Sequence, residues 1–66
     1  MTAHEKVIYI IQLLEISDSK VARAIQKSVS AASHKRLRLR DNKFTEEDYQ
    51  RIRDFYLEKL RNIEKL

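Results

Sequence analysis

Basic side chains gather in the middle of the chain, where they could bind a polyanion. The stretch SHKRLRLRDNKFTEED, residues 33–48, carries five Lys or Arg between Lys35 and Lys43 and then turns acidic. Guanidinium and ammonium groups form charge-assisted hydrogen bonds with phosphate. Residues 20–43 hold eight Lys or Arg against the single Asp41, while the segments on either side are slightly acidic. Such a distribution opposes folding through self-repulsion, so it favours an anionic partner over a merely solvated surface.

Residue patterns that support catalysis or metal binding are missing. Ser30 and His34 lie four residues apart, but no acid and no oxyanion site accompany them at a predictable spacing. The acids at 46–48 are better explained as the start of a helix. There is no Gly for a phosphate-cradling loop, no Cys, and only two His, far apart. We therefore expect no enzyme, no metal, no cofactor and no small-molecule substrate.

Length and composition predict one small all-α domain over residues 1–66. Sixty-six residues lie near the lower limit for a core that holds a fold unaided, and without Cys no disulfide can help. Dimerisation is the expected supplement. Gly and Pro are both absent, which removes the usual residues of tight turns and favours helix almost everywhere.

No segment predicts a membrane span or a signal peptide. The longest apolar run, Val7 to Leu14, is interrupted by Gln12 and falls short of the about 20 residues that cross a bilayer. No small-residue cleavage site follows the N-terminal charges. We expect a soluble, cytoplasmic protein without a membrane partner.

Hydrophobic spacing and capping residues divide the chain into four helices. The first has a broad apolar side, and the second follows Ser17 as N-cap. Either Ser28 or Ser30 can cap the third. Thr45, with Asp48 three residues later, opens the fourth, in which Glu47 and Arg51 form a favourable i,i+4 pair. The predicted ranges are 4–16, 18 to about 26, about 28–36 and about 45–65.

The last helix is too long for the others to cover. Residues 45–65 would span about 30 Å at the helical rise. Apolar residues continue to its far end, so a second copy of the chain is expected to cover them. The alternative is that the end of the helix frays. The predicted homodimer contacts are Tyr56, Leu57, Leu60 and Ile63.

The segment ISDSKVARAIQKSVSAASHK, residues 16–35, resembles the helix-turn-helix of the lambda repressor and Cro family. Ile16 matches the leading apolar residue, Ser17 the cap, Val21-Ala22 the usual Leu-Ala pair, and Ser28 the cap of the recognition helix. Ala32 falls where that family buries an apolar residue. The segment NKFTEEDYQRI, residues 42–52, is similar to the segment that follows the recognition helix in small phage Cro-like repressors. The resemblance covers residues 7 to about 56.

This resemblance implies a compact four-helix domain, with the helix-turn-helix over about 17–36, that binds double-stranded DNA as a transcriptional regulator, a Cro-like repressor of phage type. The recognition helix, about 28–36, would lie in the major groove, where base edges present distinct donors and acceptors. The implied base contacts are Val29, Ser30, Ala31, His34, Lys35 and Arg38. The residues favoured for phosphate contacts are Ser17, Ser19, Lys27, Arg36, Arg40 and Lys43, with Lys20 and Arg23 as possible additions.

Departures from the family pattern leave other interpretations open. Gln26 replaces a frequent turn Gly, Lys27 an apolar residue, and Lys35 an apolar core residue, so we expect Leu37 and Leu39 to supply core contacts instead. Val29 could pack in the core, and Ser30 could serve only as a cap. The main alternative function is a protein-interaction module on the same scaffold, an anti-repressor or an inhibitor of a host factor. RNA binding is a further alternative, although the few aromatic residues fit a core better than a base-stacking surface.

Overall fold

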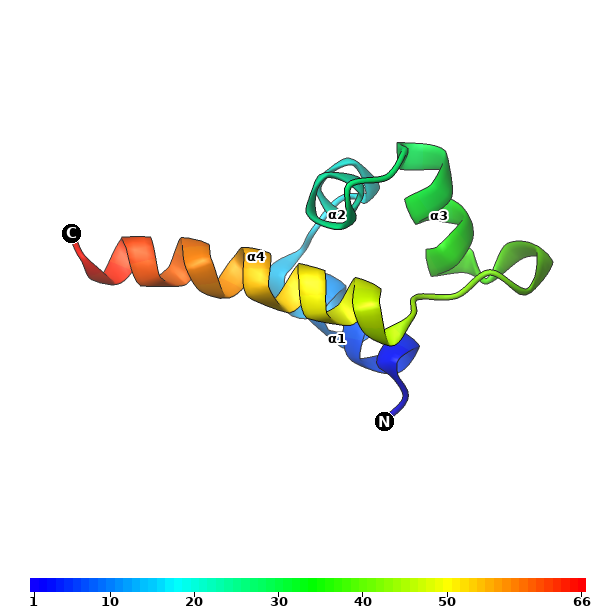
Figure 1. Cartoon of the computed structure of the whole chain (residues 1–66), viewed down its shortest axis with the longest axis horizontal. Helices are drawn as coiled ribbons and strands as arrows, with labels where there is room; N and C mark the ends of the chain where they lie inside the picture. The colour runs from blue at the N-terminus through cyan, green and yellow to red at the C-terminus, as the bar shows by residue number, and fades with distance from the viewer.

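The computed structural model describes all 66 residues and contains four α-helices and one short 3-10 turn, with no strand (Figure 1). The all-α fold predicted from the composition is confirmed. Helix α4 is the longest and is nearly as long as expected. The elements are α1 (Ala3–Leu14), α2 (Asp18–Ile25), α3 (Val29–Leu37), η1 (Leu39–Asp41) and α4 (Glu46–Glu64).

Each α-helix begins at a Ser or Thr whose hydroxyl accepts a hydrogen bond from the backbone N–H three residues later. Such a cap satisfies one of the four N–H groups that the first turn leaves unpaired. The predictions for Ser17 and Thr45 are confirmed, and Ser28 rather than Ser30 caps α3. Thr2, which sequence reasoning missed, forms a full capping box with Glu5.

The first three α-helices end in left-handed residues although the chain has no Gly. Glu15, Gln26 and Arg38 have φ of 54°, 60° and 56°. This conformation costs a residue with a Cβ roughly 1–2 kcal/mol. In return, the N–H of Gln26 reaches the carbonyls of Ala22 and Arg23, which closes the end of α2. The turns are therefore tight but strained, and each is a place where Gly would be accepted.

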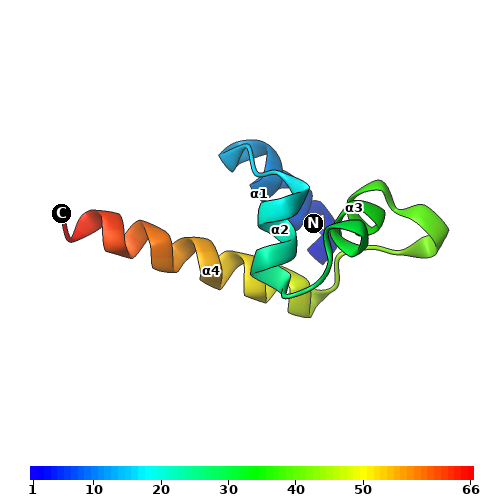
Figure 2. The ribbon, with the colours of Figure 1, turned by 90° about the horizontal axis from the view of Figure 1, so that it is seen from above.

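Helix α4 forms a long rod against which the other elements pack. Helix α1 lies along its first half, while α2 crosses above it and carries α3 on the far side (Figures 1 and 2). The C-terminal half of α4 extends beyond the other helices, so the molecule measures 43 × 25 × 19 Å. At the opposite end, the segment that joins α3 to α4 projects from the body.

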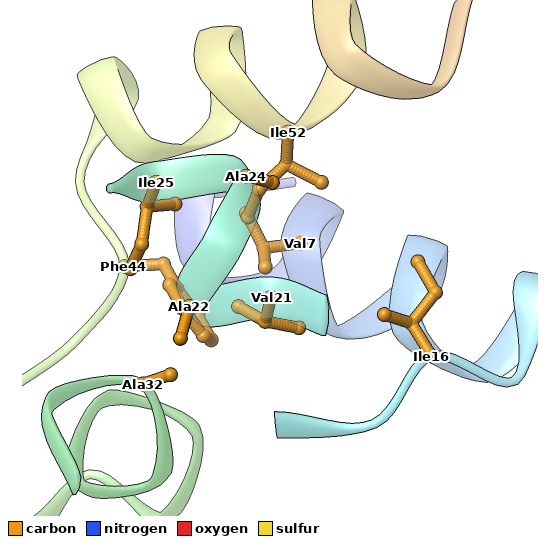
Figure 3. Packing of buried hydrophobic residues seen from close by; sticks show 9 residues of the cluster. All are labelled: Val7, Ile16, Val21, Ala22, Ala24, Ile25, Ala32, Phe44 and Ile52. Atoms are coloured by element: carbon orange, nitrogen blue, oxygen red, sulfur yellow. The ribbon is translucent and has the colours of Figure 1, made fainter. Parts of the chain in front are cut away.

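The core lies where α1, α2 and α4 meet (Figure 3). Ile52 of α4 and Val7 of α1 are fully buried, as is Phe44, which precedes α4. Ala32 is fully buried, as the family resemblance implied, and small side chains at Ala22 and Ala32 let α3 approach α2 closely. The nine core residues are Val7, Ile16, Val21, Ala22, Ala24, Ile25, Ala32, Phe44 and Ile52.

Two predictions about apolar residues are wrong. Leu37 stays out of the core because it lies on the side of α3 that faces away from the buried Ala32. Leu39 stays out because the left-handed Arg38 ends α3 and turns the chain outward. The buried side of α1 is also narrower than expected: Leu13 and Leu14 are exposed at the end of the helix. None of the helices combines the length and apolar content needed to cross a bilayer.

Candidate nucleic-acid interface

Helices α2 and α3 form a tandem pair joined by the three residues Gln26, Lys27 and Ser28. The left-handed Gln26 turns the chain at the end of α2, and the Ser28 cap starts α3 at once. A short helix held by its neighbour in this way can present its other side to a partner. The predicted helix-turn-helix segment, residues 17–36, thus coincides with the observed pair to within one residue at its C-terminal end.

An ion pair joins the two ends of this tandem. The Arg36 guanidinium donates from Nε to Asp18 Oδ1 at 2.7 Å and from Nη2 to Oδ2 at 3.0 Å. The hydrogen bond from Arg36 and the charge of its guanidinium lower the pKa of Asp18, although burial acts in the opposite direction. A bidentate pair fixes orientation as well as distance. Arg36 therefore ties the last turn of α3 to the first turn of α2.

A second, more buried ion pair joins α3 to α4. Lys35 Nζ lies 2.6 Å from Asp48 Oδ2, and the two side chains are only 15% and 4% exposed. Asp48 also accepts from the Thr45 N–H at 3.0 Å, which completes the capping box of α4. Burial alone would raise the pKa of Asp48, but the hydrogen bonds from Lys35 and Thr45 outweigh it and the pKa is lowered. Lys35 therefore anchors α3 on α4.

These two pairs change the interpretation of two predicted contacts. Lys35, expected to contact bases, points into the domain instead. Arg36, expected to contact phosphate, pairs its guanidinium with Asp18 and is partly buried. The reason is that both lie on the inner side of α3, close to Ala32 in helical phase. We assign both residues to positioning α3 and exclude them from the candidate interface.

The outer side of α3 carries most of the other predicted base contacts. Ser30 and His34 are exposed and lie nearly opposite the buried Ala32 at 100° per residue. Val29 is 51% exposed, so it is not a core residue, while Ala31 is half-buried. Sequence reasoning missed Leu37, which is exposed on the same side as Ser30. Leu37 lies seven residues, about two helical turns, after Ser30, and this spacing could have placed it on the same side from the sequence alone.

The predicted phosphate contacts that remain are exposed and have no acidic partner. Lys27 lies in the turn before α3, and Arg40 and Lys43 lie in the projecting segment after it, together with Arg38 (Figure 1). None of these four forms an ion pair. Ser17 and Ser19 are exposed at the start of α2. The free cations therefore lie before and after α3 along the chain.

His4 fixes the base of the projecting segment. Its Nδ1 accepts a hydrogen bond from the Phe44 N–H at 3.1 Å, and the two rings stack at 5.5 Å. This hydrogen bond requires a neutral ring; burial and then the charge of Arg38 lower the pKa of His4. A cleft of about 590 Å³ opens beside His4 between the starts of α1 and α4. Its lining contains the cations Arg38 and Lys43 together with the carboxylates Glu5 and Glu46, without an ion pair between them.

The predicted dimer contacts divide into two groups. Leu57, Leu60 and Ile63 are exposed on the part of α4 that extends beyond the other helices. Tyr56 instead packs against the chain's own core, so we leave it out of the dimer surface. No His, Asp and Glu side chains gather into a group that could hold a metal ion.

Comparison with known proteins found no match: no family model, no curated protein and no solved structure resembles the chain significantly. The functional interpretation therefore depends on the residues and their geometry.

Proposed function

We propose that the chain is a sequence-specific regulator that binds double-stranded DNA through α3, in the manner of a phage Cro-like repressor. The observation that carries this proposal is that α3 is held on one side only. Two ion pairs and the contact of Ala32 with α2 hold its inner side, while its outer side stays exposed. A rigid short helix with a free outer side suits the major groove, which admits one helix.

Within this proposal, the exposed residues of α3 read base edges. Val29 and Ala31 offer apolar contact to a thymine methyl, and Ser30 and His34 offer hydrogen bonds to base edges. Phosphates on either side would be held by charged or hydroxyl groups, which supply affinity without sequence information. The proposed phosphate contacts are Ser17, Ser19, Lys27, Arg40 and Lys43. Arg38, which directly follows α3, is still proposed as a base contact.

The proposal includes a homodimer formed by the distal part of α4. Leu57, Leu60 and Ile63 are exposed there, and a second α4 would cover them. Two copies related by a twofold axis would place two α3 helices on a palindromic operator, with half-sites about 34 Å apart. A domain with only nine core residues also gains stability from such an interface.

The deciding experiment selects bound duplexes from a random pool and then measures affinity for the selected duplex against salt. We expect a symmetric motif, and a slope of log affinity on log salt of about −0.9 per neutralised phosphate. The variants Lys27→Gln and Arg40→Gln should each make the slope shallower by about one unit. The matched control, Lys65→Gln, changes an exposed cation at the far end of α4. A flat salt response with no selected motif would eliminate the proposal.

One observation favours a second candidate, a protein-interaction module on the same scaffold. Leu37 and Leu39 are exposed beside the basic segment, and exposed leucines suit a protein surface better than a phosphate backbone. The module would bind an acidic partner with apolar contacts. In that case the duplex selection yields only weak, sequence-independent binding, and Leu37→Ser abolishes capture of the protein partner.

A further inference from the structure

A small basic cleft lies between α2 and α4, outside the candidate interface. Its volume is about 230 Å³, and its lining residues are Lys20, Arg23, Phe55, Tyr56 and Lys59. Figures 1 and 2 show that the distal half of α4 and helix α3 lie on opposite sides of α2. A duplex held against α3 would therefore meet the other side of the domain. Lys20 and Arg23, the possible additions to the predicted phosphate contacts, line this cleft. None of the base or phosphate contacts named under the proposed function does.

Three cations share the cleft and no acid neutralises them. Lys20, Arg23 and Lys59 form no ion pair, and no Asp or Glu lines the cleft. In contrast, the larger cleft beside His4 contains carboxylates as well as cations. Like charges brought together on a folded surface repel each other. An anion bound between them would relieve this repulsion.

Tyr56, which lines the cleft, carries a hydrogen-bond donor without a partner. The Tyr56 hydroxyl is the one buried side-chain polar atom in the chain that has no hydrogen bond. Burial raises the pKa of this hydroxyl, while the nearby charge of Arg23 acts in the opposite direction. The group therefore stays protonated and able to donate. An unpaired buried hydroxyl lowers stability. Since the hydroxyl is shielded from solvent, an acceptor oxygen in the cleft would remove this penalty only with a shift of the Tyr56 side chain that exposes the hydroxyl.

An aromatic ring holds one of the three cations in place. Lys59 Nζ lies 4.8 Å from the centroid of the Phe55 ring, a cation–π distance. Phe55 and Tyr56 meet edge to face at 5.2 Å, which fixes both rings. The two rings form an apolar wall of the cleft. The charged groups of Lys20, Arg23 and Lys59 can still contact a ligand.

We propose that this cleft binds a phosphate group, supplied by free phosphate or a small phosphate monoester. A phosphate monoester carries about −1.5 to −2 charges at neutral pH and three strong acceptor oxygens, which match three cations and one hydroxyl donor. A carboxylate supplies only one charge. The volume of the cleft accommodates a single such group but not a nucleotide. The ligand would connect α2 to α4, and the proposal stands whether or not the chain binds DNA.

The experiment titrates the full chain with inorganic phosphate at constant ionic strength, maintained with chloride, and follows backbone amide shifts by NMR. We expect saturable shifts concentrated in residues 20–24 of α2 and 55–59 of α4. Arg23→Gln should weaken the apparent affinity about tenfold, the effect of one charge-assisted hydrogen bond. Tyr56→Phe should weaken phosphate binding while it stabilises the free protein. Lys65→Gln, an exposed cation outside the cleft, is the matched control and should bind like the parent chain.

Other outcomes would overturn the proposal. Linear shifts spread over the whole surface, equal in Arg23→Gln and Lys65→Gln, would indicate only a general ionic effect. Saturation by acetate with the same affinity would indicate a carboxylate site. A third arm uses duplex DNA: loss of duplex affinity in Arg23→Gln, without saturation by phosphate, would make the cleft a contact to the DNA backbone. If Arg23→Gln fails to fold, Lys59→Gln replaces it, because Lys59 is exposed on α4.

Discussion

The buried ion pair between Lys35 and Asp48 yields the sharpest test of the structure. The change Lys35→Met keeps most of the side-chain volume and removes the charge. Asp48, only 4% exposed on its side chain, would then keep the Thr45 N–H but lose its cation. Removing one partner of a fully buried pair costs about 3–5 kcal/mol, and because Lys35 retains some solvent contact we expect about 2–3 kcal/mol. A 66-residue domain is stable by only about 3–10 kcal/mol.

The assay is urea unfolding followed by far-ultraviolet circular dichroism, with the free energy of unfolding extrapolated to water. Asp48→Asn keeps an acceptor for the Thr45 N–H and removes the charge, so the double variant with Lys35→Met leaves no unpaired ion. We expect the double variant to lose less stability than the two single losses added together. Lys43→Met is the matched control: Lys43 is exposed and forms no ion pair, so its loss should stay within about 0.5 kcal/mol.

Two results would refute this reasoning. If Lys35→Met behaves like Lys43→Met, the ion pair contributes nothing and α3 is held by other contacts. If Lys35→Met instead leaves stability unchanged and weakens duplex binding, Lys35 faces a ligand. The original prediction of a base contact would then be right.

Three further predictions concern pH, backbone strain and assembly. Because the pKa of His4 is lowered in the folded chain, its contribution to stability is complete above about pH 6.5 and declines as pH falls toward the folded pKa. Urea unfolding at a series of pH values should show this decline in the parent chain but not in His4→Asn, which retains an acceptor for the Phe44 N–H. Gln26→Gly should raise stability by about 0.5–1 kcal/mol, since Gly accepts the left-handed φ of 60° without steric strain, whereas Gln26→Ala should not; thermal unfolding distinguishes the two. Replacing both Leu60 and Ile63 by Glu should give a monomer in sedimentation without lowering the helix content, and an unchanged mass would contradict the dimer surface.

Local features of the fold were predictable from the sequence because they depend on residues a few positions apart. A capping hydroxyl reaches the N–H three residues later, so Ser17 and Thr45 could be identified without any tertiary information. Helical periodicity likewise placed Ile52 and Val7 on apolar faces, whereas the burial of Ala32 was an expectation from the family resemblance. The i,i+4 pair of Glu47 and Arg51 belongs to the same class and is observed at 2.7 Å.

The choice between core and surface was less predictable where the chain departs from regular helix. Composition predicted helix in the absence of Gly, but not that Arg38 would adopt a left-handed conformation and end α3. That turn directs Leu39 outward although its apolar side chain suggested burial. Similarly, Tyr56 appeared suited to a dimer contact, but the position of α2 above α4 leaves it partly buried against the chain's own core.

The sequence by itself determined that this chain is helical, that its second and fourth helices begin after Ser17 and Thr45, and that its positive charge gathers around the third helix. Only the tertiary structure decided which of these charges pair within the chain and which stay exposed. Lys35 meets Asp48 across 13 positions and Arg36 meets Asp18 across 18. No local pattern encodes such pairs, since both depend on how α3 packs against α2 and α4. The same packing neutralises these two cations and leaves those on either side of α3 free.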